Sequence, residues 1–177
     1  MSSRLAYPLE RAAHWDTALC LRCNRMSRRA VTRTVFRVAS RLGDGVFWYT
    51  LMVVLLARYG MQALQPVLHM MLVGLCCTVL YKWLKQRTLR PRPYEAHPDI
   101  VASGKALDRF SFPSGHTLHA VAFSVVALAY YPALAPLLLP FTALVAMSRP
   151  VLGLHYPSDV AAGALLGIVM AGASLYV

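Results

Sequence analysis

"FSFPSGHTLHAVAFSVVALAYY" (residues 110–131) joins a helix-start signal to an apolar run long enough to cross a lipid bilayer. Ser114 is a favoured N-cap residue, and the second half of the stretch is almost wholly apolar. His116 falls in the first turn of the helix that this pattern predicts. A titratable imidazole at the N-terminal end of a buried helix needs either a polar partner or a chemical role.

The rest of the chain has the composition of a polytopic membrane protein. It has 177 residues, of which 58% are hydrophobic and 14% charged, and its mean hydropathy is +0.50. A soluble domain carries about 25% charged residues. Apolar runs of about 20 residues, enough for a bilayer core of about 30 Å, predict spans at 44–60, 66–84, 113–131, 134–148 and 158–177. We therefore expect an all-α integral membrane protein with about five transmembrane helices, forming a single domain over residues 1–177.

The N-terminal segment, residues 1–42, is basic and shows no cleavable signal sequence. Its first 41 residues hold nine of the 18 Lys and Arg residues of the chain. If residues 29–42 form a helix, one of its faces is basic and the opposite face is apolar. The basic face holds Arg29, Arg33, Arg37 and Arg41, and the apolar face holds Val31, Val35, Val38 and Leu42. The pattern predicts a basic amphipathic helix in the lipid interface, next to a transmembrane core at 43–177. It does not favour a nucleic-acid partner, because aromatic residues suited to base stacking are not interleaved with the arginines.

The four cysteines do not indicate a metal centre. Cys76 and Cys77 are adjacent within an apolar run, as packing residues often are. Cys20 and Cys23 have the spacing of a zinc or redox pair, but a single such pair without a second one is weak support for either. We expect no metal ion and no cofactor.

A polar loop of about 28 residues follows the second predicted span and begins "KQRTLRPRPY" (residues 85–94). Proline restricts its own φ and pushes the preceding residue toward extended geometry. We therefore expect Arg90 and Arg92, each followed by proline, to lie on a stiff extended backbone with their side chains on one side. With Lys85, such an array suits an anion with several oxygens, such as phosphate. The alternative is a juxtamembrane basic cluster that anchors the helix end.

The third polar segment, "SRPVLGLHYPSD" (residues 148–159), joins the last two predicted spans. Arg149 ends one span, His155 follows, and Asp159 lies in the first turn of the other. A carboxylate four residues from a histidine can accept its Nδ1–H, fix the tautomer and increase its nucleophilicity. The alternative is a salt bridge between Arg149 and Asp159 that joins two helix ends.

Topology brings these segments together. From the loop at 85–112 the chain crosses the membrane through the third span and returns through the fourth. The segment 148–159 must therefore emerge on the same face as Lys85, Arg92 and His116. At the predicted start of the third span, Gly115 lets a ligand approach free N–H groups at the positive end of a helix dipole. Together these features predict an anion-binding site that holds two histidines.

These residues resemble the three-part signature of the type 2 phosphatidic acid phosphatase superfamily. "KQRTLRPRP" (residues 85–93) fits K-x6-R-P, "PSGH" (113–116) is identical to the second motif, and residues 148–159 fit S-R-x5-H-x3-D. Every motif position is filled, in order. The five-span plan is similar to that of the smaller bacterial members, whereas the Arg-rich N-terminus lies outside the signature.

The resemblance implies a metal-independent lipid phosphatase that works through a phosphohistidine. By this resemblance His155 is the nucleophile, Asp159 holds its ring, and His116 protonates the leaving oxygen and then activates water. The expected phosphate-binding groups are Lys85, Arg92, Ser114, Gly115 and Arg149. Three fixed cations suit phosphoryl transfer, which needs positioning and charge stabilisation. The remaining loop carboxylates, Glu95, Asp99 and Asp108, are too scattered for a two-metal site.

The substrate expected from the resemblance is a phosphorylated lipid, with undecaprenyl diphosphate favoured. Phosphatidylglycerophosphate, phosphatidate and a lipid phosphotransferase reaction are the alternatives. A vanadium haloperoxidase-like oxidoreductase and a catalytically silent scaffold are more remote ones. Further cations that suit a diphosphate are Arg87, Arg90, Lys105 and Arg109. His119, one turn after His116, either contacts the substrate or packs within its helix.

Two arguments assign the site to opposite faces of the membrane. Nearly every Lys and Arg lies on the face that carries the site, which the positive-inside rule assigns to the cytoplasm. The family resemblance implies the extracytoplasmic face of a bacterial inner membrane, and we favour this assignment. The sequence indicates no oligomeric state.

Overall fold

The structure, a computed structural model, describes the backbone of residues 3–176 and the side chains of residues 11–176. Helices make up most of this part of the chain, and no strand occurs in it. The helices, in chain order, are α1 (Ser3–Arg25), α2 (Ala30–Arg41), α3 (Phe47–Tyr59), α4 (Leu64–Thr88), α5 (Pro93–Ala96), α6 (Gly115–Tyr130), α7 (Ala135–Val151) and α8 (Pro157–Ser174).

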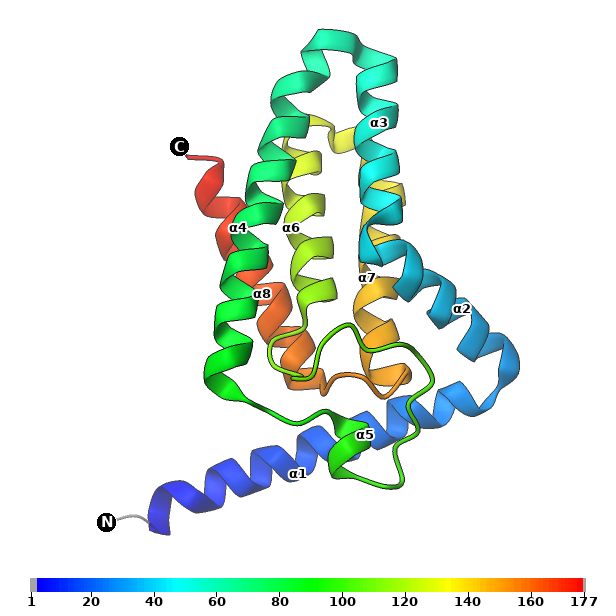
Figure 1. The fold of residues 1–177 in the computed structure, drawn as a ribbon, viewed down its shortest axis with the longest axis vertical. Helices are drawn as coiled ribbons and strands as arrows, with labels where there is room; N and C mark the ends of the chain where they lie inside the picture. Colours follow the sequence, from blue (N-terminus) through cyan, green and yellow to red (C-terminus); the bar gives the residue numbers. More distant parts are fainter. Residues whose placement is uncertain (1–2, 177) are drawn as a thin grey trace.

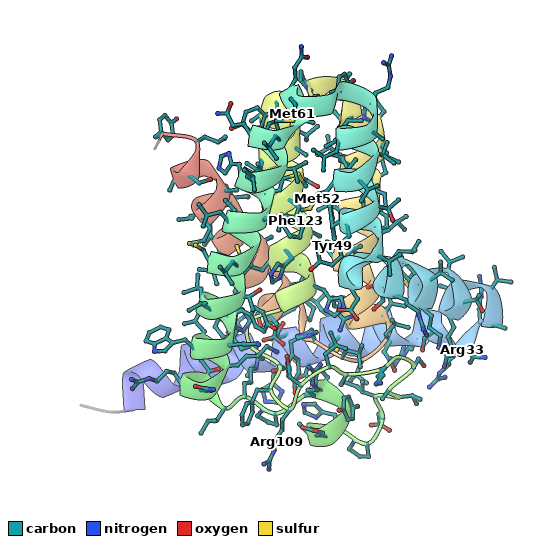
Figure 2. The ribbon with its side chains drawn as sticks, turned by 45° about the horizontal axis from the view of Figure 1, so that its top comes forward. Arg33, Tyr49, Met52, Met61, Arg109 and Phe123 are labelled. Atoms are coloured by element: carbon teal, nitrogen blue, oxygen red, sulfur yellow. The ribbon has the colours of Figure 1, made fainter. Side chains whose placement is uncertain are left out.

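Helices α3, α4, α6, α7 and α8 pack side by side as a bundle (Figure 1). They correspond to the five predicted spans. Three helical stretches, at 30–96, 132–151 and 157–174, are long and apolar enough to cross a membrane, and α6 is a shorter apolar helix. Figure 2 shows Met52 and Phe123 among the helices, whereas Arg33 and Arg109 project outward. The predicted all-α membrane architecture is confirmed.

The N-terminal segment consists of two helices rather than the single one predicted. A short 3₁₀ turn, Met26–Arg28, separates α1 from α2, and the buried Ser27 hydroxyl donates to the Asn24 carbonyl oxygen (2.8 Å). The hydroxyl thereby satisfies a carbonyl that the ended helix leaves free. Helix α1 then runs across the end of the bundle where the long loop and the α7–α8 connection lie (Figure 1).

Polar side chains of α1 hold it against those connections. The Asn24 side chain donates to the carbonyl oxygens of Val101 and Val151 and accepts from the Val101 amide, at 3.0–3.1 Å. Asp16 accepts from the Ser158 amide at the start of α8 (2.9 Å). Buried backbone groups need such partners, so α1 supports these connections.

Helices α6 and α8 pack so closely that glycines separate them. A Cβ atom on Gly163 would lie 2.6 Å from the Ser114 carbonyl oxygen, and one on Gly167 would lie 2.7 Å from that of Leu118. Small residues at a four-residue spacing allow this approach between membrane helices. The contact fixes the start of α6, where His116 lies, against the start of α8.

We predict that Gly163→Ala destabilises the protein, because its new methyl group meets backbone that cannot move without shifting a helix. The expected loss is about 1–3 kcal/mol, as for other overpacked cores. Thermal unfolding in detergent measures it. Gly172→Ala is the matched control, since a Cβ there has no neighbour within 4 Å among the described residues. Equal unfolding temperatures for the two variants would contradict the prediction.

Candidate active site

A cavity of about 160 Å³ lies at the end of the bundle that α1 crosses. Seven of the residues predicted for the site line it: Lys85, Arg92, Gly115, His116, His119, Arg149 and His155. They come from the end of α4, the long loop, the start of α6, the end of α7 and the α7–α8 connection. Topology therefore does bring these three polar segments to one place.

The start of α6 is held by its cap and by α8. Ser114 is the N-cap, as predicted, and its hydroxyl oxygen accepts from the Thr117 amide (3.5 Å). Its own amide donates to the Asp159 carbonyl oxygen (3.0 Å). Ser114 is fully buried and is not among the residues that line the cavity, unlike Gly115 and His116.

His155 lies in the α7–α8 connection, after a glycine with a left-handed backbone. Gly153 has φ +74°, and a Cβ there would lie 2.7 Å from the Val101 carbonyl oxygen. The His155 side chain is 2% exposed, and its Nε2 atom lies 3.4 Å from Arg92 Nη1. Because a guanidinium group can only donate, Nε2 accepts and carries the free electron pair. That electron pair faces the cationic side of the cavity.

Asp159 lies beside the other nitrogen of this ring. Its Oδ2 atom is 3.7 Å from His155 Nδ1, which is longer than a hydrogen bond. Two stronger contacts hold the fully buried carboxylate: Oδ2 accepts from the Tyr156 amide (2.9 Å) and Oδ1 accepts from Arg90 (2.6 Å). The carboxylate is thus fixed within ion-pair distance of His155.

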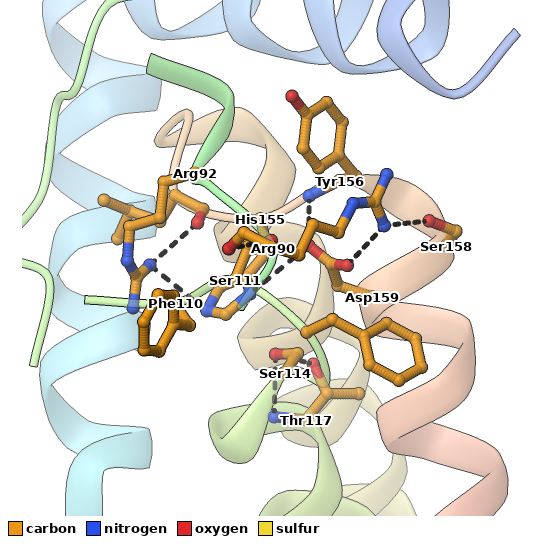
Figure 3. A network of polar contacts seen from close by, with 12 residues as sticks. Arg90, Arg92, Phe110, Ser111, Ser114, Thr117, His155, Tyr156, Ser158 and Asp159 are labelled. Atoms are coloured by element: carbon orange, nitrogen blue, oxygen red, sulfur yellow. Dashed lines mark hydrogen bonds and ion pairs between the residues drawn. The ribbon is translucent and has the colours of Figure 1, made fainter. Parts of the chain in front are cut away.

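Arg90 and Arg92 do not act as one array, contrary to the expectation from the extended backbone. Figure 3 shows their guanidinium groups on different sides of the His155 ring. Arg90 donates to Asp16 (2.8 Å) as well as Asp159, and it is not among the residues that line the cavity. Two carboxylates outside the loop determine its direction, and one of them comes from α1.

Three buried cations face the cavity, and two of them share one carboxylate. Asp108 Oδ1 accepts from Lys85 and from Arg92, at 2.8 Å in each case. Arg149 is 1% exposed and donates to the Ser40 hydroxyl (2.6 Å), while its Nε is a buried atom without a partner in the described part of the chain. The cavity is therefore cationic even with Asp108 present.

Asp44 is a cavity residue that sequence reasoning missed. It lies between Gly43 and Gly45 in the turn that joins α2 to α3, and its Oδ1 atom is 3.5 Å from His116 Nε2. This is ion-pair distance when the ring is protonated. A lone carboxylate between two glycines at the start of an apolar span was the available signal.

His119 lines the cavity but has structural partners. Its Nδ1 lies 2.8 Å from the Gly115 carbonyl oxygen, and its Nε2 lies 3.0 Å from the Thr78 hydroxyl of α4. These contacts join α6 to α4. Of the two roles expected for this residue, packing between helices has direct support.

The electrostatics of the loops match these contacts. Burial, together with the charges of Arg149, Arg92 and Lys85, lowers the pKa of His155 well below its ordinary value. Burial alone would raise the pKa of Asp108, but the hydrogen bond and charge of Lys85, and those of Arg92, outweigh burial and lower it. At neutral pH His155 is therefore neutral and Asp108 is charged.

Comparison with known proteins gives matches of sequence and of fold. The pattern that defines the PAP2 superfamily matches residues 62–177. The decaprenylphosphoryl-5-phosphoribose phosphatase of Mycolicibacterium smegmatis is 40% identical over 80 residues, which are 45% of this chain and 42% of that protein. The match thus covers less than half of the relative's length.

Two crystal structures are similar over nearly the whole chain. A transmembrane PAP2 type phosphatidylglycerolphosphate phosphatase from Bacillus subtilis has a TM-score of 0.73 and 25% identity, over 93% of this chain and 85% of that chain. Aquifex aeolicus LpxE has a TM-score of 0.78 and 28% identity, over 90% of this chain and 94% of that chain. The helical arrangement, including most of the N-terminal part, is therefore shared with these proteins.

We predict that Asp108→Asn lowers the unfolding temperature at pH 7 and that inorganic phosphate restores much of the loss. Removal of the carboxylate leaves Lys85 and Arg92 without their shared countercharge, and a bound oxyanion replaces it. Because the pKa of Asp108 is lowered, its contribution is present at pH 7 and is lost as the pH falls through that pKa.

The measurement is thermal unfolding in detergent with and without phosphate. Asp99→Asn is the matched control, since Asp99 lies in the same loop and does not line the cavity. A loss in Asp108→Asn that phosphate leaves unchanged would contradict the prediction.

Proposed function

Because this chain belongs to the PAP2 superfamily, we propose that it is a membrane lipid phosphatase that acts through a phosphohistidine at His155. The observation that carries the proposal is the pairing of two histidines, His155 and His116, in one cavity with three buried cations. Phosphoryl transfer needs an oriented nucleophile, stabilisation of charge on the phosphate oxygens and a proton for the leaving oxygen. The cavity residues can supply all three.

In the first step, the free electron pair on His155 Nε2 attacks phosphorus as the bond to the leaving oxygen breaks. Lys85, Arg92 and Arg149 stabilise the non-bridging oxygens, and the Gly115 amide at the start of α6 is a further donor. His116 gives its proton to the leaving oxygen. Asp44, 3.5 Å from this ring, pairs with it while it is charged.

In the second step, the neutral His116 takes a proton from water as the water oxygen attacks phosphorus. The P–N bond to His155 breaks, and inorganic phosphate leaves. Asp159 stays beside the His155 ring, with Oδ2 3.7 Å from Nδ1, and Arg90 holds Asp159 in that place. Asp159 and Arg90 are thus positioning residues rather than phosphate ligands. The same reasoning makes Ser114 a residue that positions the start of α6.

The substrate we favour is undecaprenyl diphosphate, cleaved to undecaprenyl phosphate. The relative from M. smegmatis is named for a decaprenyl-linked phosphate, which supports a polyprenyl tail. The B. subtilis protein is named for phosphatidylglycerolphosphate, which is the main alternative. Release of phosphate from each lipid by purified protein, in EDTA, decides between them.

We predict that the two histidine variants differ on an activated ester. His155→Ala abolishes phosphate release from every substrate, because no covalent intermediate can form. His116→Ala loses about 10²–10⁴-fold on a lipid phosphate but much less on p-nitrophenyl phosphate, whose leaving group departs without a proton. Equal losses in His116→Ala on both substrates would refute the acid role, and an active His155→Ala protein would refute the mechanism.

We predict a bell-shaped pH dependence of kcat/KM whose acid limb lies well below pH 6.5. His155 must be neutral to attack, and its lowered pKa keeps it neutral until the pH falls to that value. Removal of a nearby cation in Arg149→Gln stabilises the protonated ring, so the acid limb moves to higher pH. Arg87→Gln, whose side chain packs over Trp83 instead, is the control. An acid limb that stays in place in Arg149→Gln would contradict the electrostatic origin.

A further inference from the structure

A second cavity of about 610 Å³ adjoins the catalytic one. Asp44, Leu107 and His116 line both cavities, so the two are continuous at these residues. The remaining walls come from α2, the turn after it, the loop at 102–107 and Leu152. The family pattern begins at residue 62, so the α2 wall lies outside it.

The second cavity is basic. Arg37 and Arg41 reach it from one face of α2, one turn apart, and Lys105 reaches it from the facing loop. Arg37 is fixed there because its Nε donates to the Ser103 carbonyl oxygen. The hydroxyl-bearing residues Ser40 and Ser103 also line it. Asp44 is the one carboxylate among the described residues that line this cavity, and it lies within ion-pair distance of His116.

The second cavity lies on the His116 side of the catalytic cavity, and this position indicates which part of the substrate enters it. His155, Lys85, Arg92 and Arg149 line the catalytic cavity alone, whereas His116 lines both. In an in-line displacement the leaving group departs on the side opposite the nucleophile, where the acid stands. The leaving group therefore extends past His116 into the basic cavity.

We propose that the second cavity binds an anionic phosphate of the leaving group, through Arg37, Arg41 and Lys105. This inference rests on the phosphatase function proposed above. The preferred substrate is then a lipid with two phosphates, one that is cleaved and one that stays with the tail. Arginine and lysine suit this role because they make charge-assisted hydrogen bonds to phosphate oxygens. Val46 supplies apolar surface for the carbon chain beside it.

The same arginines have another explanation, which is attraction of α2 to anionic lipid headgroups. That attraction depends on charge near the membrane and acts on every substrate alike. A subsite for a second phosphate acts only on substrates that carry one. Matched pairs of substrates therefore separate the two explanations.

The test compares farnesyl diphosphate with farnesyl phosphate, and phosphatidylglycerophosphate with phosphatidate, in detergent micelles. The variant is Arg41→Gln with Lys105→Gln. Arg37 is left unchanged because it also holds the loop. The control is Arg28→Gln with Arg29→Gln, which removes the same charge from residues that do not line the cavity. The readout is kcat/KM for phosphate release.

We expect the cavity variant to lose about tenfold or more on at least one substrate with two phosphates, and less than about threefold on both monophosphates. The control should change by less than about threefold on all four. Equal losses on the paired substrates, or no loss on either two-phosphate lipid, would overturn the subsite while leaving the phosphatase standing. A wild-type protein that releases phosphate from none of the four lipids would overturn both.

Discussion

The burial of Lys85, Arg92 and Arg149 at the end of an apolar bundle is the constraint on which the site depends. Buried charges are costly unless they are paired and hydrogen-bonded. Asp108 compensates two of these cations and the Ser40 hydroxyl contacts the third, which leaves excess positive charge in the cavity. We therefore expect an oxyanion such as phosphate to complete this compensation.

Support for His155 comes from parts of the chain that carry no phosphate ligand. Asn24 and Asp16 of α1 bind the backbone at the two ends of the α7–α8 connection, which carries His155. Asp159 is held by Arg90, which also pairs with Asp16. These hydrogen bonds and ion pairs fix the backbone on both sides of His155 and the carboxylate of Asp159 beside its ring. The mechanism proposed above requires such rigidity, because His155 has to approach phosphorus in line.

The sequence predicted the features that periodicity and short spacing determine. The all-α membrane architecture, the Ser114 cap and the family are confirmed, because each depends on residues close together in the chain. The partners of Arg90, the site of Asp108 and the approach of Asp44 to His116 could not be predicted, since each depends on how distant loops pack. The expectation for Arg90 was wrong because the local backbone preference of an Arg-Pro pair says nothing of Asp16, which lies 74 residues away.

The contact between Asp16 and the start of α8 has a consequence for the order in which the protein forms. It joins residues 142 positions apart, so it closes only after synthesis has passed residue 158. Contacts of such long sequence separation form late, because the loop between them must be ordered first. His155 and Asp159 themselves are synthesised after the loop at 85–112. A chain synthesised only as far as the loop at 85–112 therefore holds Lys85 and Arg92 but lacks His155, the nucleophile proposed above.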